Sequence, residues 1–113
     1  MITISIEAEN TILSIRPEGR LDTINSSQFD QAIKPLAEKE LYLIIDFSEC
    51  NYLSSTGIRI LLATFKKLKA KGGLLFIAGI STEVFQVLEM AGLHQFFQFC
   101  NNVVSARAEI NRL

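Results

Sequence analysis

Two stretches near the start of the chain alternate between apolar and polar residues, as a β-strand with one buried face does. Residues 2–7 (ITISIE) show this alternation, and residues 11–16 (TILSIR) show it again. Residues 8–10 between them predict a turn, while Pro17 and Gly19 are expected to end the second strand. The pattern therefore predicts an antiparallel β-hairpin at the start of the chain.

The pattern then changes to that of a helix, in which apolar side chains recur three or four residues apart. Residues 26–39 and 56–70 show this period most clearly. Residues 82–91 show it over a shorter stretch that places Ala91 on the buried face, and residues 102–112 predict a final helix. The chain is thus expected to form about four α-helices.

Residues at the ends of these segments support the predicted helices. Asn25 is a suitable N-cap for the first helix, and Gln28 three residues later completes a start that resembles a capping box. Either Ser81 or Thr82 can cap the third helix. The lysines within residues 66–71 lie at the end of the second helix, where the helix dipole favours positive charge.

Two nearly continuous apolar runs lie between the predicted helices. Residues 41–47 (LYLIIDF) and 74–78 (LLFIA) are typical of strands that are covered on both faces. Residues 96–99 (FFQF) predict a short last strand. Because helices and strands alternate after the hairpin, these later strands are expected to be parallel. The predicted fold is therefore a single α/β domain with a mixed sheet, in which an antiparallel hairpin precedes parallel strands.

Composition narrows the class of protein. The 113 residues suit one domain spanning positions 1–113, and 49% hydrophobic residues can supply its core. Eleven basic and twelve acidic residues give a net charge of −1 without a basic stripe, which disfavours direct binding of nucleic acid. No apolar run approaches the roughly 20 residues of a membrane helix, and the N-terminal stretch does not resemble a signal peptide. We therefore expect a cytoplasmic protein without membrane insertion.

The sulfur and imidazole side chains do not form a recognisable site. Cys50 and Cys100 are separated by fifty positions in apolar surroundings and are expected to be reduced residues in or near the core. His94 is the only histidine and is expected at the surface or half-buried. A structural zinc site would lack its four ligands, so no metal and no cofactor are expected.

Candidate chemistry lies at the carboxyl ends of the predicted strands, where open α/β sheets place their sites. Three predicted loops are found there: residues 19–25, 48–55 and 79–82. If the strands run parallel, these loops open on one edge of the sheet. The middle loop attracts attention because it leads into the most amphipathic predicted helix.

This loop ends in Ser54-Ser55-Thr56-Gly57, so Ser55 is expected at or beside the N-cap of the second helix. A hydroxyl at this place is commonly a helix cap, which contributes roughly 1 kcal/mol. Three consecutive hydroxyls exceed what one cap requires, however, and a glycine in the first turn indicates close approach of another group to the backbone. Capping and binding therefore remain two interpretations of the same residues.

Motifs for catalysis are not found in this sequence. It contains no GxGxxG, no GxxxxGK[ST] and no GxSxG. The serines have no adjacent base, and Asp22, Asp46 and Glu49 are isolated carboxylates near strand ends, of which Asp22 is expected to orient the 19–25 loop. We therefore expect a protein that is not an enzyme.

Five segments in order carry a resemblance to a known family. Residues 19–22 (GRLD), 43–48 (LIIDFS) and 52–59 (YLSSTGIR) are followed by 72–73 (GG) and 87–93 (VLEMAGL). Together they resemble a STAS domain over essentially the whole chain. Stand-alone domains of this length are similar to bacterial anti-sigma factor antagonists.

The resemblance implies a partner-switching mechanism that regulates transcription. In that family the unphosphorylated antagonist binds an anti-sigma factor, which is also a serine kinase, and thereby frees a sigma factor. The kinase phosphorylates a serine at the start of the second major helix, and a PP2C-type phosphatase removes the phosphate. The family's acceptor serine corresponds to Ser55. The surface that binds the partner is expected to comprise the solvent face of the second helix together with Asp22, Ser54, Ser55, Thr56, Gly57, Ile58 and Arg59.

One position departs from the commonest family sequence, because Ser54 stands where an aspartate usually precedes the acceptor. Ser54 and Thr56 are therefore secondary candidates for phosphorylation. An alternative function is a STAS module that binds a protein or a small ligand without being phosphorylated. Arg59 likewise has two interpretations, as a contact to the partner or as an ordinary solvated helix residue.

Overall fold

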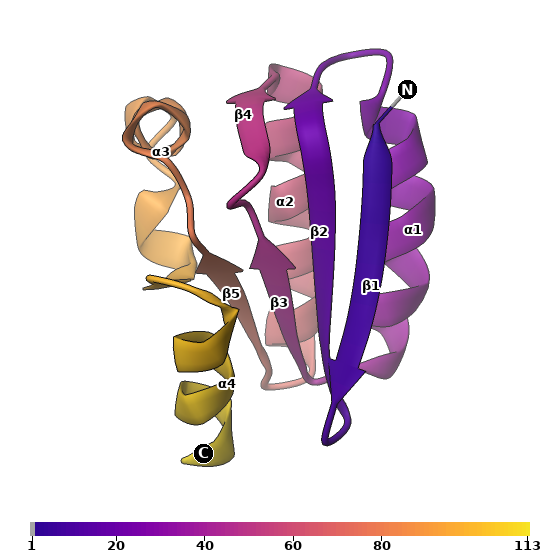
Figure 1. Cartoon of the computed structure of the whole chain (residues 1–113), viewed down its shortest axis with the longest axis vertical. Coiled ribbons are helices and arrows are strands. Elements are labelled where there is room, and N and C mark those ends of the chain that lie inside the picture. Colours follow the sequence, from indigo (N-terminus) through magenta and orange to yellow (C-terminus); the bar gives the residue numbers. More distant parts are fainter. Residues whose placement is uncertain (1) are drawn as a thin grey trace.

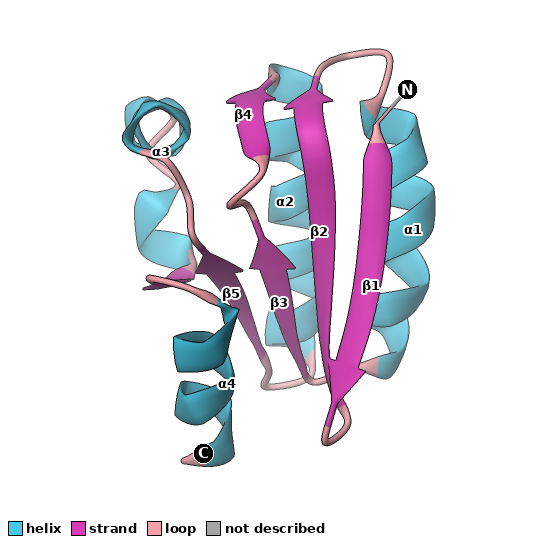
Figure 2. Ribbon diagram, in the orientation of Figure 1, coloured by secondary structure: helices cyan, strands magenta, loops and turns pink. Residues whose placement is uncertain are grey.

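The structure, a computed structural model that describes residues 2–113, has an α/β fold (Figure 1). Its elements, in chain order, are β1 (Thr3–Glu9), β2 (Ile12–Leu21), α1 (Ser26–Lys39), β3 (Tyr42–Asp46), β4 (Cys50–Leu53), α2 (Ser55–Ala70), β5 (Leu74–Ala78), α3 (Thr82–Met90), the 3₁₀ turn η1 (His94–Phe96), β6 (Gln98–Cys100) and α4 (Val103–Asn111). Figure 2 shows helices on both sides of one sheet. The predicted fold class, an α/β domain with a mixed sheet and four α-helices, is confirmed.

The N-terminal hairpin forms as predicted, with β1 and β2 antiparallel from Thr3 opposite Glu18 to Glu9 opposite Ile12. Its turn lies slightly later than residues 8–10. The two residues between the strands are Asn10 and Thr11, whose φ angles are 51° and 67°. Positive φ at both central residues is the geometry that matches the right-handed twist of a hairpin.

The prediction that Pro17 and Gly19 end the second strand is wrong, because β2 continues to Leu21. The strand pairs with β3 over residues 13–15 and with β4 from Gly19 onward, so Pro17 lies between two parallel partners and opposite neither. Gly19 has a φ of 112° where the register with β4 shifts, a conformation that glycine tolerates.

The sheet has the order β1-β2-β3-β5-β6, and β4 lies beside β2. Every pair after the hairpin is parallel, so the carboxyl ends of β2, β3 and β5 lie toward one edge of the sheet, at the top of Figure 1. Strand β4 was not predicted and occupies the segment expected as the 48–55 loop. Only its first and last residues, Cys50 and Leu53, are buried, so the sequence shows no alternation there.

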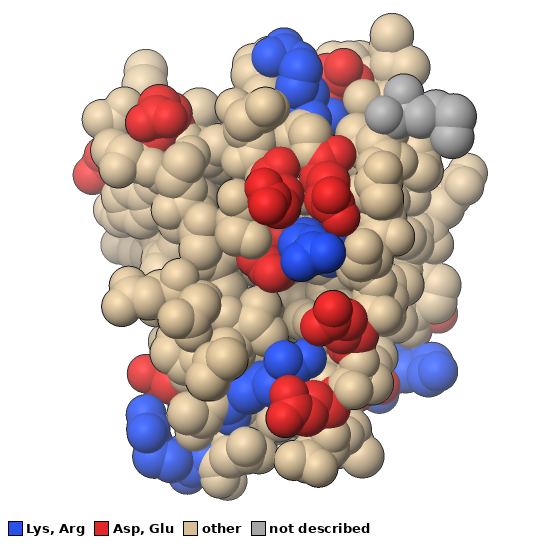
Figure 3. Space-filling model, in the orientation of Figure 1, with Lys and Arg blue, Asp and Glu red and all other residues tan. Residues whose placement is uncertain are grey.

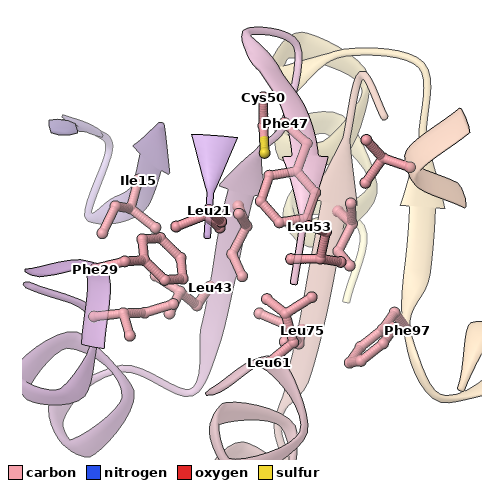
Figure 4. Close-up of a cluster of buried hydrophobic side chains, with 14 of the residues drawn as sticks. Ile15, Leu21, Phe29, Leu43, Phe47, Cys50, Leu53, Leu61, Leu75 and Phe97 are labelled. Carbon is pink, nitrogen blue, oxygen red and sulfur yellow. The ribbon is translucent and has the colours of Figure 1, made fainter. Parts of the chain in front are cut away.

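Two hydrophobic clusters occupy the two faces of the sheet. The larger cluster lies between the sheet and the first three helices, with Phe29 of α1, Leu61 of α2 and Val84 of α3 among its members (Figure 4). The smaller one packs Ile44 and Phe76 and other sheet residues against α4. This coverage on both faces explains the continuous apolar runs of β3 and β5.

The capping box predicted at the start of α1 is wrong. The Asn25 side chain makes no cap hydrogen bond; its amide donates instead to the carbonyl of Arg20 at 3.2 Å. The Gln28 side chain donates to the carbonyl of Ile2 at 2.9 Å. Asp22 does the local capping, because its carboxylate accepts the N–H of Asn25 at 2.8 Å.

The C-terminal third differs in small ways from the prediction. Ser81 caps α3 by accepting the N–H of Val84, but the helix ends at Met90 and Ala91 is exposed rather than buried. The last strand lies at Gln98–Cys100 instead of residues 96–99, because residues 94–96 form the 3₁₀ turn η1. The final helix, α4, lies within its predicted range.

The cysteines are free, as expected: Cys50 is buried and Cys100 is half-buried. Burial raises the pKa of the Cys50 thiol, although hydrogen bonds to backbone groups of Tyr52 and Leu21 oppose this shift. Burial, and then the nearby charge of Glu109, raise the pKa of the Cys100 thiol. Neither environment favours a thiolate.

Candidate functional site

The candidate site forms where β2 and β4 end side by side. Leu21 and Leu53, the last residues of the two strands, are paired, and the N–H of Ser54 donates to the carbonyl of Leu21 at 2.8 Å. Asp22 and Ser54 therefore follow directly from paired positions. This unpredicted pairing brings the loop of residues 22–25, which follows β2, close to the start of α2 (Figure 1).

Ser54, not Ser55, is the N-cap of α2. Its hydroxyl accepts the backbone N–H of Gly57 at 3.1 Å, and the residue is only 7% exposed. Ser55 is the first helical residue, which agrees with the prediction that it lies at or beside the cap. Ser54 is thus a structural residue whose hydroxyl is already occupied.

The other two hydroxyls differ from that of Ser54. Ser55 is exposed, and its hydroxyl makes no hydrogen bond with any group in residues 2–113. Thr56 is half-buried, and its hydroxyl accepts a hydrogen bond from the Arg59 guanidinium at 3.3 Å. Among the three consecutive hydroxyls, that of Ser55 is the most accessible to a reacting group.

Gly57 is buried and allows α2 to pack closely on the strands. A Cβ atom at this position would lie 2.8 Å from Cδ1 of Leu53 and 3.5 Å from Cβ of Leu21. The close approach expected at this glycine is therefore made by the protein's own leucines rather than by a ligand. Ile58 is half-buried and packs against the larger cluster, so the outer surface of this turn consists mainly of Ser55, Thr56 and Arg59.

Asp22 is half-buried and orients the loop that precedes α1, as predicted. Besides the bond from its carboxylate to Asn25, its carbonyl accepts the N–H of Ser26 at 3.0 Å and the Ser26 hydroxyl at 2.5 Å. These contacts hold the residues after β2 in a tight turn beside the start of α2.

Three residues of this surface were missed as site residues by the sequence analysis. Ile24 is 85% exposed in the 19–25 loop, and Tyr52 of β4 is 40% exposed. The guanidinium of Arg20 lies 4.0 Å from the centre of the Tyr52 ring, within the range of a cation–π contact. Ile24, an isoleucine among the otherwise polar residues 22–25, was the one sequence feature that could have identified this surface.

A shallow groove between α1 and α2 continues from this surface. Thr23, Ser27, Asp30 and Lys34 line one side, and Thr56, Arg59, Ile60 and Ala63 line the other. Asp30 and Lys34 form an ion pair across one helical turn at 3.4 Å. Arg59 therefore lies at the edge of a concave surface, close to the first turn of α2.

The third predicted loop meets the beginning of the middle one, where a Cβ atom at Gly79 would lie 3.0 Å from Cβ of Ser48. Strand β5 ends at Ala78, opposite Asp46, which is the last residue of β3. The chain then enters α3 (Figure 1). Within residues 2–113, no group of three or more His, Cys, Asp or Glu side chains is placed to hold a metal ion. Each helix of the described residues is too short or too polar to cross a lipid bilayer.

Comparisons with known proteins agree with this architecture. The family model described as the STAS domain matches residues 3–106. The chain is 24% identical over 108 residues to an anti-sigma-B factor antagonist of Bacillus subtilis (strain 168), and the alignment covers 96% of this chain and 94% of the relative. It is 28% identical over 102 residues to an anti-sigma-B factor antagonist of Listeria monocytogenes, and that alignment covers 88% of this chain and 90% of the relative.

Solved structures show the same fold. The anti-sigma factor antagonist SpoIIAA in its unphosphorylated form has a TM-score of 0.84 at 19% identity, covering 98% of both chains. The phosphorylated form of the Bacillus cell fate determinant SpoIIAA has a TM-score of 0.75 at 19% identity, covering 96% of this chain and 99% of that one. Since the family model extends over nearly all of the sequence and the fold agrees, the protein belongs to the STAS domain family.

Proposed function

We propose that this STAS domain is an anti-sigma factor antagonist that is controlled by phosphorylation of Ser55. In its unphosphorylated form it binds an anti-sigma factor that is also a serine kinase, and so releases a sigma factor. A PP2C-type phosphatase restores the binding form, and the protein works in the cytoplasm as a binding module without catalytic activity. The curated relatives that carry the name of anti-sigma-B factor antagonist support this proposal.

The observation that carries the proposal is the position of the Ser55 hydroxyl. It is exposed on the first residue of α2, while the hydroxyls of Ser54 and Thr56 on either side are engaged by Gly57 and Arg59. A kinase can therefore reach Ser55 without breaking the helix cap. This favours Ser55 over Ser54 and Thr56 as the acceptor.

The energetics permit a switch without a change of fold. A phosphate adds about −1.5 to −2 charges at neutral pH. At a helix N-terminus this charge is stabilising by roughly 0.3–2 kcal/mol, so the domain is expected to stay folded. Burial of an unpaired phosphate against a partner costs several kcal/mol, and about 2.8 kcal/mol already weakens binding a hundredfold.

The partner surface proposed for the unphosphorylated form surrounds Ser55. It comprises Asp22 and Ile24 of the 19–25 loop, Tyr52 of β4, and Thr56 and Arg59 of α2. Ser54, Gly57 and Ile58 contribute by positioning this turn, because Ser54 and Gly57 are buried and Ile58 is half-buried. The exposed apolar side chains of Ile24 and Tyr52 supply the area that a protein interface needs.

The test uses the full chain with phosphoserine incorporated at position 55 during translation, so that no cognate kinase is needed. Binding to each kinase-type anti-sigma factor of the source organism is measured by calorimetry for this form, for the unmodified chain and for Ser55→Ala. We expect the unmodified chain and Ser55→Ala to bind one such protein, and phosphoserine to weaken that binding about a hundredfold or more. Equal binding of all three forms would show instead a STAS module that is not switched by phosphorylation.

The identity of the acceptor is tested separately. The chain is incubated with the anti-sigma factor that binds it and with ATP, and the phosphorylated residue is located by peptide mass spectrometry. Ser54→Ala and Thr56→Val are expected to be phosphorylated and Ser55→Ala is not. Phosphate on residue 54 or 56 in the unaltered chain would contradict the assignment.

A further inference from the structure

The charges of this protein are segregated, although its net charge is only −1. Residues 26–40 and 55–71 comprise α1, α2 and the single residue after each helix. They hold all six lysines and Arg59 against Asp30, Glu38 and Glu40, a net charge of +4. The remaining residues hold four arginines and nine acidic side chains, a net charge of −5. Figure 3 shows many acidic groups, with basic groups between them, on the opposite face of the sheet. The layer formed by α1 and α2 is therefore the basic side of the molecule.

Half of the lysines in this layer are already used within the fold. Lys34 pairs with Asp30, and Lys67 pairs with Glu38 of the neighbouring helix. Lys71 donates to three backbone carbonyls at the end of α1. In contrast, Lys39, Lys66 and Lys69 are exposed, and no carboxylate in residues 2–113 lies within ion-pair distance of them.

Two of these unpaired lysines lie beside an aromatic surface. Leu62, Phe65, Lys66 and Lys69 follow the i, i+3, i+4, i+7 spacing and therefore share one face of α2. Phe96 of η1 stacks on Phe65 with ring centres 5.3 Å apart and is itself 39% exposed. We name these five residues the basic–aromatic patch.

The patch is a firm platform rather than a pair of loose side chains. The ring of Phe65 contacts two others: it stacks on Phe96, and it meets the buried Phe97 in an edge-to-face contact with ring centres 5.8 Å apart. The ammonium group of Lys69 lies 5.7 Å from the centre of the Phe65 ring. Aromatic surface held in place in this way loses little conformational entropy when it binds.

We propose that the basic–aromatic patch is a second docking surface, which binds an acidic segment of a partner protein through two carboxylates and one apolar side chain. The carboxylates pair with Lys66 and Lys69, and the apolar side chain packs on Phe96 and Leu62. Two unpaired lysines are too few for a nucleic-acid surface, and the net charge of −5 on the rest of the chain repels a long polyanion. A protein segment of limited negative charge fits this surface best.

Docking at this patch is independent of phosphorylation at Ser55. Phe65 follows Ser55 by ten positions on the same helix, which corresponds to about 15 Å along the axis. Charges on the surface are screened within about 8–10 Å at physiological ionic strength. The patch can therefore hold a partner in both states of the proposed switch.

The probe is a short synthetic peptide in which aspartate and glutamate residues flank one central phenylalanine. It is titrated into the full isotope-labelled chain, and backbone NMR shifts are followed at low and at physiological salt. We expect saturable shifts that centre on residues 62–69 and 95–97, and affinity that falls as salt rises. Shifts spread evenly over α1 and α2, or no saturation, would overturn the proposal.

Variants separate the patch from general electrostatics. Lys66→Glu is expected to weaken binding about tenfold, whereas the matched control Lys39→Glu makes the same charge change at the end of α1 and leaves the affinity within about twofold. Phe96→Ala is expected to weaken binding as much as Lys66→Glu; should it fail to fold, Phe96→Gln serves in its place. An equal loss in Lys39→Glu would overturn the proposal.

Two further measurements decide what occupies the patch and whether it is independent of Ser55. A single-stranded oligonucleotide and phosphatidylserine vesicles are titrated in parallel. If either binds at residues 62–69 more tightly than the peptide does, the patch is a site for a polyanion, and the proposal of a protein partner is overturned. Peptide affinity is also compared with and without phosphoserine at position 55. Equal affinity is expected, and a clear dependence on the phosphate would show that the two surfaces are coupled. This readout does not require that Ser55 be phosphorylated in the cell, so it can fail or succeed separately from the proposed function.

Discussion

The hydroxyl of Ser54 accepts the backbone N–H of Gly57 at 3.1 Å, and this bond gives two adjacent serines different roles. Ser54 is buried and caps α2, while Ser55 carries an exposed hydroxyl without a partner in residues 2–113. Resemblance to the family predicts an aspartate at position 54. Serine there also caps a helix, so the cap does not require the aspartate.

The first prediction concerns these two serines. Ser54→Ala is expected to lower the free energy of unfolding by about 1 kcal/mol, because the N–H of Gly57 loses its acceptor. Ser55→Ala is expected to change it by less than about 0.5 kcal/mol, because the side chain is exposed and makes no hydrogen bond. Urea denaturation followed by circular dichroism measures both.

The control for this pair is Ser54→Asp, which keeps a capping oxygen at the same position. It is expected to retain the stability of the unaltered chain within about 0.5 kcal/mol. A larger loss in Ser55→Ala than in Ser54→Ala would contradict the division of roles between the two hydroxyls.

The second prediction contrasts two glycines. In Gly57→Ala the new Cβ meets the movable tip of Leu53, and alanine gains about 1 kcal/mol of helix propensity, so stability should stay within about 1 kcal/mol of the original. In Gly73→Ala the Cβ would overlap the backbone carbonyl of Leu41, which cannot turn aside. A loss of about 1–3 kcal/mol or more is expected there. Thermal unfolding measures the loss of stability in both variants. A larger loss in Gly57→Ala than in Gly73→Ala would contradict this reasoning.

The third prediction concerns Lys71, whose ammonium group closes the end of α1. It donates to the carbonyls of Ala37 at 2.7 Å, Glu38 at 3.1 Å and Glu40 at 2.6 Å. Lys71→Met should cost about 1 kcal/mol, because these carbonyls at a helix C-terminus lose a charged donor that remains partly solvated. Lys39→Met removes an exposed lysine without such contacts and is the matched control. Denaturation midpoints that fall equally in both variants would argue against this capping role.

The fourth prediction concerns thiol reactivity and pH. Because burial raises the pKa of Cys50, its thiol stays protonated at pH values where an ordinary thiol begins to ionise. Since burial raises the pKa of both thiols, access to the reagent decides the order: iodoacetamide at mildly alkaline pH should modify the half-buried Cys100 first, and Cys50 only when the chain unfolds. Mass spectrometry of a labelling time course shows the order. Rapid labelling of Cys50 in the folded protein would contradict its burial.

The same shift has a consequence for stability. A thiol whose pKa is higher in the folded than in the unfolded state is protonated in both states at low pH, where it does not affect stability. As the pH rises, the thiol ionises first in the unfolded chain, and this ionisation stabilises the unfolded state. The free energy of unfolding should therefore fall as the pH rises above the ordinary thiol value of about 8.5. Cys50→Ala should show a smaller fall than the unaltered chain over the same pH range.

Much of the fold could be predicted because it depends on local patterns. Strands β3 and β5 are continuous apolar runs because they are buried on both faces. Helices α1 and α2 carry an apolar stripe because each is buried on one face. Strand β4 could not be predicted, since only Cys50 and Leu53 of its four residues are buried and it is stabilised by pairing with the distant β2. The continuation of β2 past Pro17 has the same cause, because its partners come from elsewhere in the chain.

The candidate site divides in the same way. The three consecutive hydroxyls at the start of α2 are evident from the sequence, and they identified Ser55 as a candidate. Which hydroxyl serves as the cap depends on where the helix begins, and that is decided by the pairing of Leu53 with Leu21 and the packing of Gly57 on both. The stacking of Arg20 on Tyr52 likewise depends on the pairing of β2 with β4, and the exposed Ile24 lies just beyond this pair, so this surface forms only in the folded protein.

The sequence by itself determined the class of fold, the order of its elements apart from β4 and η1, and the serine-rich segment, because each depends on residues that are close together along the chain. The tertiary structure decided the remainder: the role of each hydroxyl, the extent of β2, and the platform in which Phe96 covers Phe65 beside unpaired lysines. These features depend on contacts between residues far apart in sequence. Such contacts form on folding because the backbone groups of paired strands need hydrogen-bond partners and because the apolar faces of the helices are buried together.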